Sequence, residues 1–312
     1  MHDVQSSYLV RRPATSQFVE ARGIRHHLTS WGSPALVSAE RPPLVLVHGY
    51  MDVGASFQFL VDAMEQLEGA SRYVLALDLR GYGRTQSPAA VDAYWFPDYL
   101  GDLDAVFRAL FDDRPLDLLG HSMGGNICMV YAGVRPTRVR RLVNLEGFGL
   151  PESDPADAPD RYALWLEQLA TEQTMPTFGD YEAVARRLCR NNPRLPPNKA
   201  AWLARQWAAG DDGQLKVLGD PAHKRVNPIL YRMLEAQTCW ARIQAPVLWV
   251  EGKQTEAERF WGGRYSLADF HRRLDVVTTP VQREALDDAG HMLHHDQPEK
   301  LAELVVRFLA AR

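Results

Sequence analysis

The sequence predicts an α/β fold in which a mostly parallel sheet is flanked by helices, with a helical insertion in the second half of the chain. Three observations predict it. Short runs rich in Val and Leu alternate with amphipathic segments, as strands and helices do in α/β folds. The runs are nearly all apolar, which is typical of parallel strands covered on both faces. One run, which ends at residue 119, leads directly into a glycine-rich turn and a helical pattern.

The apolar runs are predicted as buried strands of the sheet, at residues 44–47, 73–77, 116–119, 142–145 and 247–250. Between and after them, apolar residues at helical spacing predict helices over about 55–67, 97–111 and 298–310. Residues 18–31 differ, because a bend at Gly23 indicates an antiparallel hairpin at the edge of the sheet.

The composition changes at Pro151. From there to about Arg242 we find no convincing buried strand, and helical patterns dominate. We therefore expect residues 1–150 and 243–312 to form the α/β core and residues 151–242 to form a helical cap over an active site. The alternative is a helical satellite packed on the edge of the sheet. The segment is rich in tryptophan, with Trp165, Trp202, Trp207 and Trp240.

Bulk composition excludes several classes of protein. Of the 312 residues, 46% are hydrophobic and 24% charged, which is typical of a soluble globular chain. A net charge of -4 argues against a nucleic-acid partner. Three cysteines without a disulfide or metal spacing indicate a reducing compartment. Neither a secretory signal nor a membrane span is visible, so we expect a cytoplasmic protein with a small-molecule substrate, and a homodimer is left open.

The strongest functional signal is the pentapeptide GHSMG at residues 120–124. It lies between a predicted strand and a helix predicted from about Asn126, which is the context of a nucleophile elbow. Its two glycines leave room for a tight, strained turn that presents the serine hydroxyl at a helix N-terminus. We therefore expect Ser122 to be a catalytic nucleophile.

A serine that attacks a carbonyl needs backbone N–H donors for the developing oxyanion. We expect one donor to be the amide of Met123, directly after the nucleophile. The other should come from the loop after the first buried strand. There Gly49 lets the backbone turn towards the pocket, so the amide of Tyr50 is preferred and that of Met51 is the alternative. His48 is expected to be a structural hydrogen-bonding residue.

A histidine late in the chain is the candidate general base. His291 follows a glycine in a loop after a predicted strand and precedes an acid-proline helix start, so we expect it to be the base. His294 and His295 lie nearer that helix start, and we expect them to be surface or capping groups. Three close histidines also raise the question of a metal site, but no second set of ligands is evident in the sequence. No metal or organic cofactor is predicted.

Together these motifs resemble the α/β-hydrolase superfamily. The HGYM loop, the stretch DLRGYGR at 78–84, the GHSMGG elbow and the late GHMLH occur in the expected order over nearly the whole chain. The resemblance is strongest to the capped branch with serine hydrolase-like proteins, meta-cleavage C–C hydrolases, haloalkane dehalogenases and epoxide hydrolases. It implies that residues 78–84 form a structural loop beside the pocket.

The elbow residue separates these relatives. Dehalogenases and soluble epoxide hydrolases that resemble this fold use an aspartate there, because they form an alkyl-ester intermediate. Ser122 implies acyl transfer instead, on esters, thioesters, amides, lactones or activated C–C bonds. The resemblance therefore implies a carboxylesterase-like serine hydrolase, with an apolar substrate suggested by the aromatic cap. The alternatives are a C–C bond hydrolase, a cofactor-free haloperoxidase-like enzyme or a non-catalytic ligand-binding protein.

The acid of the triad departs from the common pattern of the superfamily. The resemblance implies an aspartate three residues after the glycine that ends the strand at 247–252, but Thr255 stands there and cannot orient an imidazole as a carboxylate does. Glu146 directly follows another buried strand, at the sheet edge that faces the active site in α/β folds. Some capped relatives carry their glutamate at this strand end. We expect Glu146 to be the acid, with Glu256 and then Glu251 as alternatives, in which case Glu146 would pair with a cap arginine.

Overall fold

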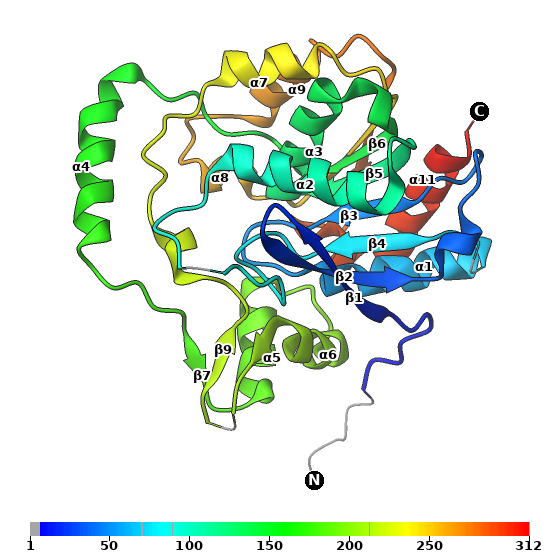
Figure 1. The fold of residues 1–312 in the computed structure, drawn as a ribbon, viewed down its shortest axis with the longest axis horizontal. Coiled ribbons are helices and arrows are strands. Elements are labelled where there is room, and N and C mark those ends of the chain that lie inside the picture. Colours follow the sequence, from blue (N-terminus) through cyan, green and yellow to red (C-terminus); the bar gives the residue numbers. More distant parts are fainter. Residues whose placement is uncertain (1–6, 70, 89, 212, 312) are drawn as a thin grey trace.

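An eight-stranded sheet with helices on both faces forms the body of the molecule (Figure 1). The computed structural model describes residues 7–69, 71–88, 90–211 and 213–311. The strand order is β1-β2-β4-β3-β5-β6-β10-β11. The strands are β1 (Thr15–Ala21), β2 (Ile24–Trp31), β3 (Leu44–Val47), β4 (Val74–Leu77), β5 (Leu116–His121), β6 (Val139–Leu145), β10 (Val247–Gly252) and β11 (Val281–Leu286). The α/β fold class that the sequence predicts is confirmed.

The sheet is parallel from β4 to β11, and only its first two pairings are antiparallel. The predicted hairpin is confirmed: β1 pairs with β2 across a turn at Gly23, whose φ is +72°. At the opposite edge, β11 has polar residues at its centre, and only its last residue, Leu286, is buried. It was not among the predicted buried runs, because an edge strand does not need the continuous apolar pattern of a central one.

Two apolar layers cover the faces of the sheet, and successive residues of a strand enter opposite layers. On β5, Leu118 belongs to the same apolar layer as Leu103 and Phe107, whereas Leu119 belongs to the layer that contains Leu60 and Leu301. The first layer joins the sheet to α2 (Phe96–Phe111), α3 (Met123–Val134), α7 (Met233–Trp240) and α9 (Leu267–Leu274). The second joins it to α1 (Gln58–Glu68), α10 (Leu293–Asp296) and α11 (Pro298–Ala310). The short helix α8 (Ala257–Phe260) follows β10. The 3-10 turns are Pro34–Leu36, Gly54–Phe57, Pro136–Arg138, Pro155–Asp157 and Pro221–Lys224.

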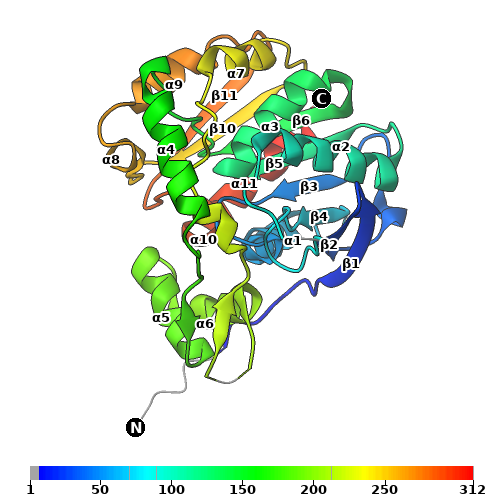
Figure 2. The ribbon, with the colours of Figure 1, turned by 60° about the vertical axis from the view of Figure 1, so that its left-hand side comes forward.

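Residues 151–242, which we call the insertion, lie between β6 and β10. They contain α4 (Ala158–Leu169), α5 (Tyr181–Asn191), α6 (Pro197–Trp207) and a separate small sheet of β7 (Thr177–Phe178), β9 (Leu215–Val217) and β8 (Ala208–Ala209). Figures 1 and 2 show α4 at the outer side of the molecule, with α5 and α6 gathered apart from it. None of the described side chains of α4 is buried.

Different helices of the insertion pack against different parts of the core. Helices α5 and α6 share an apolar cluster with Phe59 of α1, and Trp202 and Trp207 lie partly buried at its rim. Helix α7 instead packs on α3, and its Trp240 is fully buried in the main core. Because Trp240 packs with Phe270 of α9, it supports the core rather than an outer cap.

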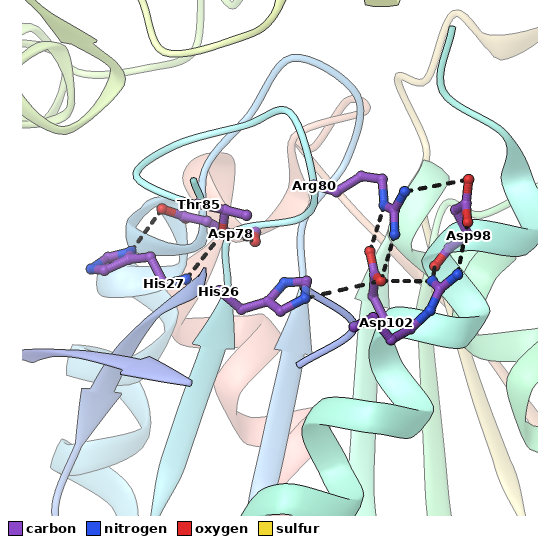
Figure 3. Close-up of polar contacts among 8 residues, drawn as sticks. His26, His27, Asp78, Arg80, Thr85, Asp98 and Asp102 are labelled. Atoms are coloured by element: carbon purple, nitrogen blue, oxygen red, sulfur yellow. Dashed lines mark hydrogen bonds and ion pairs between the residues drawn. The ribbon is translucent and has the colours of Figure 1, made fainter. Parts of the chain in front are cut away.

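The loop at residues 78–84 is held by a network of polar contacts (Figure 3). The buried Asp78 carboxylate hydrogen-bonds His27 Nδ1 at 2.7 Å and accepts from the amides of Gly54 and Arg84. Arg80 forms a bidentate pair with Asp102 of α2, with both distances at 2.7 Å. These contacts fix the loop to the hairpin and to α2, in agreement with the structural role that the resemblance implies.

Among the described residues, none of the helices combines the length and the apolar character that crossing a bilayer requires. The three cysteines are free, and Cys128 is buried in the core.

Candidate active site

Ser122 occupies a single-residue turn between β5 and α3. Its φ of +52° and ψ of -117° are strained for a residue with a side chain, and such strain is concentrated at functional sites. The neighbouring glycines make the turn sterically feasible. A Cβ on Gly120 would clash with the carbonyl oxygen of Gly124, and a Cβ on Gly124 would clash with that of Val47. The local sequence is therefore what allows the serine to stand at the N-terminus of α3.

Ser122, His291 and Glu146 form one hydrogen-bonded chain. His291 Nε2 lies 2.9 Å from Ser122 Oγ, and His291 Nδ1 lies 2.8 Å from Glu146 Oε2. The histidine comes from the loop after β11 and the glutamate from the end of β6. The carboxylate can only accept at Nδ1, so Nδ1 carries the proton and Nε2 is left to accept the serine hydroxyl. The structure thus brings together the three side chains that the sequence singles out.

Glu146 is built into the structure as a buried hydrogen-bond acceptor. Its side chain is shielded from solvent, and its φ of +54° lies in the left-handed region. Besides His291, it accepts from the backbone amide of Gly252 and from Thr255 Oγ1, both at 2.7 Å. These donors offset the cost of burying a carboxylate. Thr255, which stands where the resemblance implies the acid, is therefore a hydrogen-bond donor to the glutamate that faces the histidine.

The alternative acids lie elsewhere. Glu256 is exposed and faces Arg259 at 3.4 Å. Glu251 contacts Trp249 Nε1 and His271 Nε2, each at 2.9 Å. Within the part of the chain that the structure describes, neither carboxylate hydrogen-bonds to His291.

The loop after β3 lies directly against the elbow. A Cβ on Gly49 would stand 3.1 Å from Ser122 Cβ, so any larger residue would push the loop away from the serine. Tyr50 follows with a half-exposed ring, and Met51 has a φ of +55°. On the other side of Ser122, Met123 is the first residue of α3, where helix N–H groups are free to bind an anion. Both segments expected to supply the oxyanion donors therefore border the nucleophile.

His48 is buried and holds two backbone segments together. Its Nδ1 donates to the carbonyl oxygen of Gly49 at 2.7 Å, and its Nε2 accepts from the amide of Leu79 at 3.0 Å. Both ring nitrogens are thus engaged by backbone groups. This placement matches the structural role expected for His48.

The expectation that His294 and His295 are surface or capping groups was wrong. Both are buried, because α10 turns them towards α1 rather than towards solvent. The centroid of the His294 ring lies 4.6 Å from that of the His121 ring and 4.9 Å from that of the Phe57 ring. Burial lowers the pKa of His295 to about 3, so this imidazole is neutral at physiological pH.

His121 is a residue of the site that sequence reasoning missed. Its Nε2 donates to the main-chain carbonyl oxygen of His291 at 2.7 Å, so the elbow is tied to the loop that carries the candidate base. Burial lowers the pKa of His121 far below its ordinary value, which keeps the ring neutral. Its position beside the nucleophile was the available signal, but the pattern GHSMG alone does not show where the histidine points.

The insertion is attached to the loops that carry these residues. Trp207 Nε1 donates to the carbonyl oxygen of Met51 at 2.8 Å. The side-chain amide of Asn192 donates to the carboxylate of Asp296 in α10 at 2.7 Å, and Arg194 donates to the side chain of Gln254. The insertion therefore contacts the turn that follows the candidate base and the loop after β3, residues 48–51, which we call the oxyanion loop because it is expected to supply one oxyanion donor.

The model of a protein family described as the alpha/beta hydrolase fold matches residues 42–298 of the chain. Epoxide hydrolase 3 of Siraitia grosvenorii is 24% identical, over 91% of this chain and 94% of the relative. Serine hydrolase-like protein of Danio rerio is also 24% identical, over 86% and 81% of the two chains. The thioesterase domain from the curacin biosynthetic pathway superposes with a TM-score of 0.77 at 26% identity, over 94% of this chain and 99% of that one.

The family model covers well over half of the chain, and the structural likeness extends over nearly all of it. The chain therefore belongs to the α/β hydrolase-fold family. The relatives named above carry the names of hydrolases, and they include both serine and epoxide hydrolases.

Proposed function

We propose that this protein is a serine hydrolase that cleaves small, apolar carboxylic esters through an acyl-enzyme intermediate. One observation carries the proposal: the hydrogen-bonded chain from Ser122 through His291 to Glu146, with distances of 2.9 and 2.8 Å. An unprotonated nitrogen in contact with a strained serine at a helix N-terminus is the arrangement that activates a hydroxyl for attack on a carbonyl.

In the acylation step, Ser122 Oγ attacks the ester carbonyl carbon while its proton passes to His291 Nε2. The carbonyl electrons move onto oxygen, and the backbone amides of Met123 and Tyr50 stabilise the negative charge. Each donor of this kind contributes about 3 kcal/mol in related enzymes. Glu146 stabilises the imidazolium. When the tetrahedral intermediate collapses, His291 returns the proton to the departing alkoxide, and the alcohol leaves.

Deacylation repeats these steps with water. His291 Nε2 accepts a proton from a water molecule, whose oxygen attacks the acyl carbon. Collapse of the second intermediate returns the proton to Ser122 Oγ and releases the carboxylic acid. The enzyme regains its starting protonation state, and the balance is one ester and one water converted to one acid and one alcohol.

The insertion supports an apolar substrate, and we propose that it acts as the cap of the active site. Half of the large apolar side chains that are exposed in the described structure lie in this segment or in the loop that leads into it, namely Leu150, Tyr162, Leu164, Leu166, Ile229 and Leu234. Apolar groups left exposed in one region are typical of a surface that receives a ligand.

The names of the relatives bear on the reaction. The serine hydrolase-like protein and the thioesterase domain are consistent with acyl chemistry, whereas the epoxide hydrolase name favours opening of an oxirane. An oxirane-opening enzyme of this fold forms an alkyl ester on a carboxylate nucleophile, and Ser122 offers a hydroxyl instead. Acyl transfer is therefore the reaction that fits this elbow.

The test combines a serine-directed fluorophosphonate probe with a panel of p-nitrophenyl esters of increasing acyl length and with styrene oxide. We expect Ser122 to be labelled, short to medium esters to be hydrolysed and styrene oxide to remain intact. Ser122→Ala should lose labelling and lower kcat by roughly 10^5-fold. Ser38→Ala, in an exposed loop, is the matched control and should behave as wild type.

Other outcomes would assign a different function. Opening of styrene oxide without ester hydrolysis would overturn the ester proposal. Labelling of Ser122 without turnover of any ester would favour C–C bond hydrolysis or haloperoxidase-like chemistry. Absence of labelling in a folded protein would favour a ligand-binding role.

A further inference from the structure

A second cluster of chemically capable side chains lies beside the candidate active site. Asp52 follows the oxyanion loop, and His294 and His295 belong to α10, more than 240 residues further along the chain. One potential ligand atom from each of the three side chains lies within 4.8 Å of the others. All three side chains are buried, with exposed fractions of 6%, 0% and 2%.

Several ring nitrogens of this cluster lack hydrogen-bond partners. Within the described part of the chain, both nitrogens of His294 and the Nε2 of His295 are buried without a hydrogen-bond partner. Buried polar atoms of this kind are rare and costly unless something else satisfies them. Neutral imidazole nitrogens with free lone pairs are also the commonest metal ligands in proteins.

The carboxylate is already oriented towards the histidines. Asp52 Oδ1 accepts from the amide of Val53, and Asp52 Oδ2 accepts from Ser56 Oγ, both at 2.9 Å. Supporting bonds of this type hold the ligands of metal sites in place. Asp52 Oδ2 lies 3.9 Å from His294 Nε2, which is too long for a hydrogen bond. Two ligands of a tetrahedral ion with bonds of about 2.0 Å stand roughly 3.3 Å apart, so a small movement closes the gap.

We propose that Asp52, His294 and His295 bind a divalent transition metal ion, with zinc as the best match. Two imidazole nitrogens and one carboxylate oxygen are a donor set that zinc favours. Calcium and magnesium fit poorly, because they prefer oxygen ligands throughout. Three protein ligands leave the fourth position of a tetrahedral ion to a further small ligand.

The ion would join two segments that carry the candidate active site. Asp52 directly follows Met51 of the oxyanion loop, and His294 lies three residues after His291. The ring of His294 also packs against His121, which donates to the main-chain oxygen of His291. Binding would therefore brace the oxyanion loop against the turn of the candidate base. We expect saturating zinc to raise the Tm by about 5 °C, because a ligand that binds only the native state stabilises it.

The experiment uses chelator-stripped wild-type protein titrated with Co2+ and with Zn2+. We expect one Co2+ per chain with the visible absorption of a tetrahedral nitrogen-oxygen site, displacement of Co2+ by Zn2+, and one Zn2+ per chain by calorimetry. Asp52→Asn and His295→Asn should each weaken Zn2+ binding at least tenfold. The control His271→Asn changes a histidine on α9 that contacts Glu251 and should bind as wild type.

His291→Ala is the decisive companion, because the His291–Glu146 pair of the candidate active site could also hold the ion. Unchanged Zn2+ binding in this variant supports the proposed cluster, and lost binding would place the ion on the catalytic side chains and overturn the proposal. Wild-type protein without a tetrahedral Co2+ spectrum, or undiminished binding by both Asp52→Asn and His295→Asn, would also overturn it. Should Asp52→Asn fail to fold by circular dichroism, the wild-type titrations and His295→Asn decide the outcome. These readouts measure binding and do not depend on turnover.

Discussion

The core and the insertion of this protein differ in how they use their apolar residues. In the core, helix α2 buries Leu103 and Phe107 completely against the sheet. In the insertion, helix α4 buries none of its described side chains and exposes Tyr162 and Leu166. The core therefore supplies stability and holds Ser122, His291 and Glu146 in fixed positions, whereas the outer helix of the insertion leaves its side chains exposed.

The largest expected effect is on kcat and concerns Glu146, the buried member of the Ser122–His291–Glu146 chain. Glu146→Gln should lower kcat by roughly 10^4-fold, because an amide can donate to His291 Nδ1 and so favour the wrong tautomer. Ester hydrolysis by the purified variant measures it. Stability should fall as well, since the Gly252 amide and the Thr255 hydroxyl lose a charged acceptor.

Glu256→Gln is the matched control, since Glu256 is an exposed carboxylate whose side chain pairs with the equally exposed Arg259. Its kcat should stay within about twofold of wild type, as expected for an exposed side chain outside the chain of catalytic contacts. A large loss confined to Glu256→Gln would reverse the assignment of the acid.

The second prediction compares truncations in the two regions directly. Phe107→Ala should lower the free energy of unfolding by about 3–5 kcal/mol, because it leaves a cavity in a fully buried layer. Leu166→Ala, on the exposed surface of α4, should change it by less than about 0.5 kcal/mol. Urea unfolding followed by circular dichroism measures both.

For KM, we expect the opposite order of effects in these two variants. Leu166→Ala should raise KM for longer acyl chains, whereas the folded fraction of Phe107→Ala should keep the wild-type KM. Equal stability losses in the two variants would show that α4 is packed in solution and would remove the contrast between the regions.

Much of the core could be read from the sequence, because its physical requirements leave a local pattern. Continuous apolar runs specify the central parallel strands, and the turn around Ser122 requires glycine on both sides. Glu146 was also identifiable, since a carboxylate at the end of a buried strand needs a partner. These features depend on residues that are close together in the chain.

The features that were missed depend on contacts between distant segments. The burial of His294 follows from the packing of α10 on α1, and the donation by His121 depends on where the late loop crosses the elbow. Trp240 was grouped with the cap by its position in the chain, although α7 packs on α3. The small sheet of the insertion escaped notice because its strands have only two or three residues.

The last expected effect concerns the junction between the two regions. His223 of the insertion stacks between Tyr82 and Tyr94 of the core, with ring centroids 3.9 and 3.8 Å away. Burial lowers the pKa of His223 from about 6.5 to about 4. Between these two values the unfolded chain binds more protons than the native one, so stability rises with pH across that window. The contribution is complete above about pH 6.5 and is lost as the pH falls towards 4.

The difference in pKa corresponds to a stability change of up to about 3 kcal/mol. His121 and His295 also have lowered pKa values, so wild type alone cannot isolate this residue. Urea unfolding of wild type and His223→Phe at pH 7 and pH 4.5 isolates it, because phenylalanine keeps the stacking and removes the proton site. We expect the loss of stability between the two pH values to be smaller in His223→Phe. An identical loss in both proteins would mean that His223 is accessible to protons in the native state, and that the insertion opens away from the core without unfolding it.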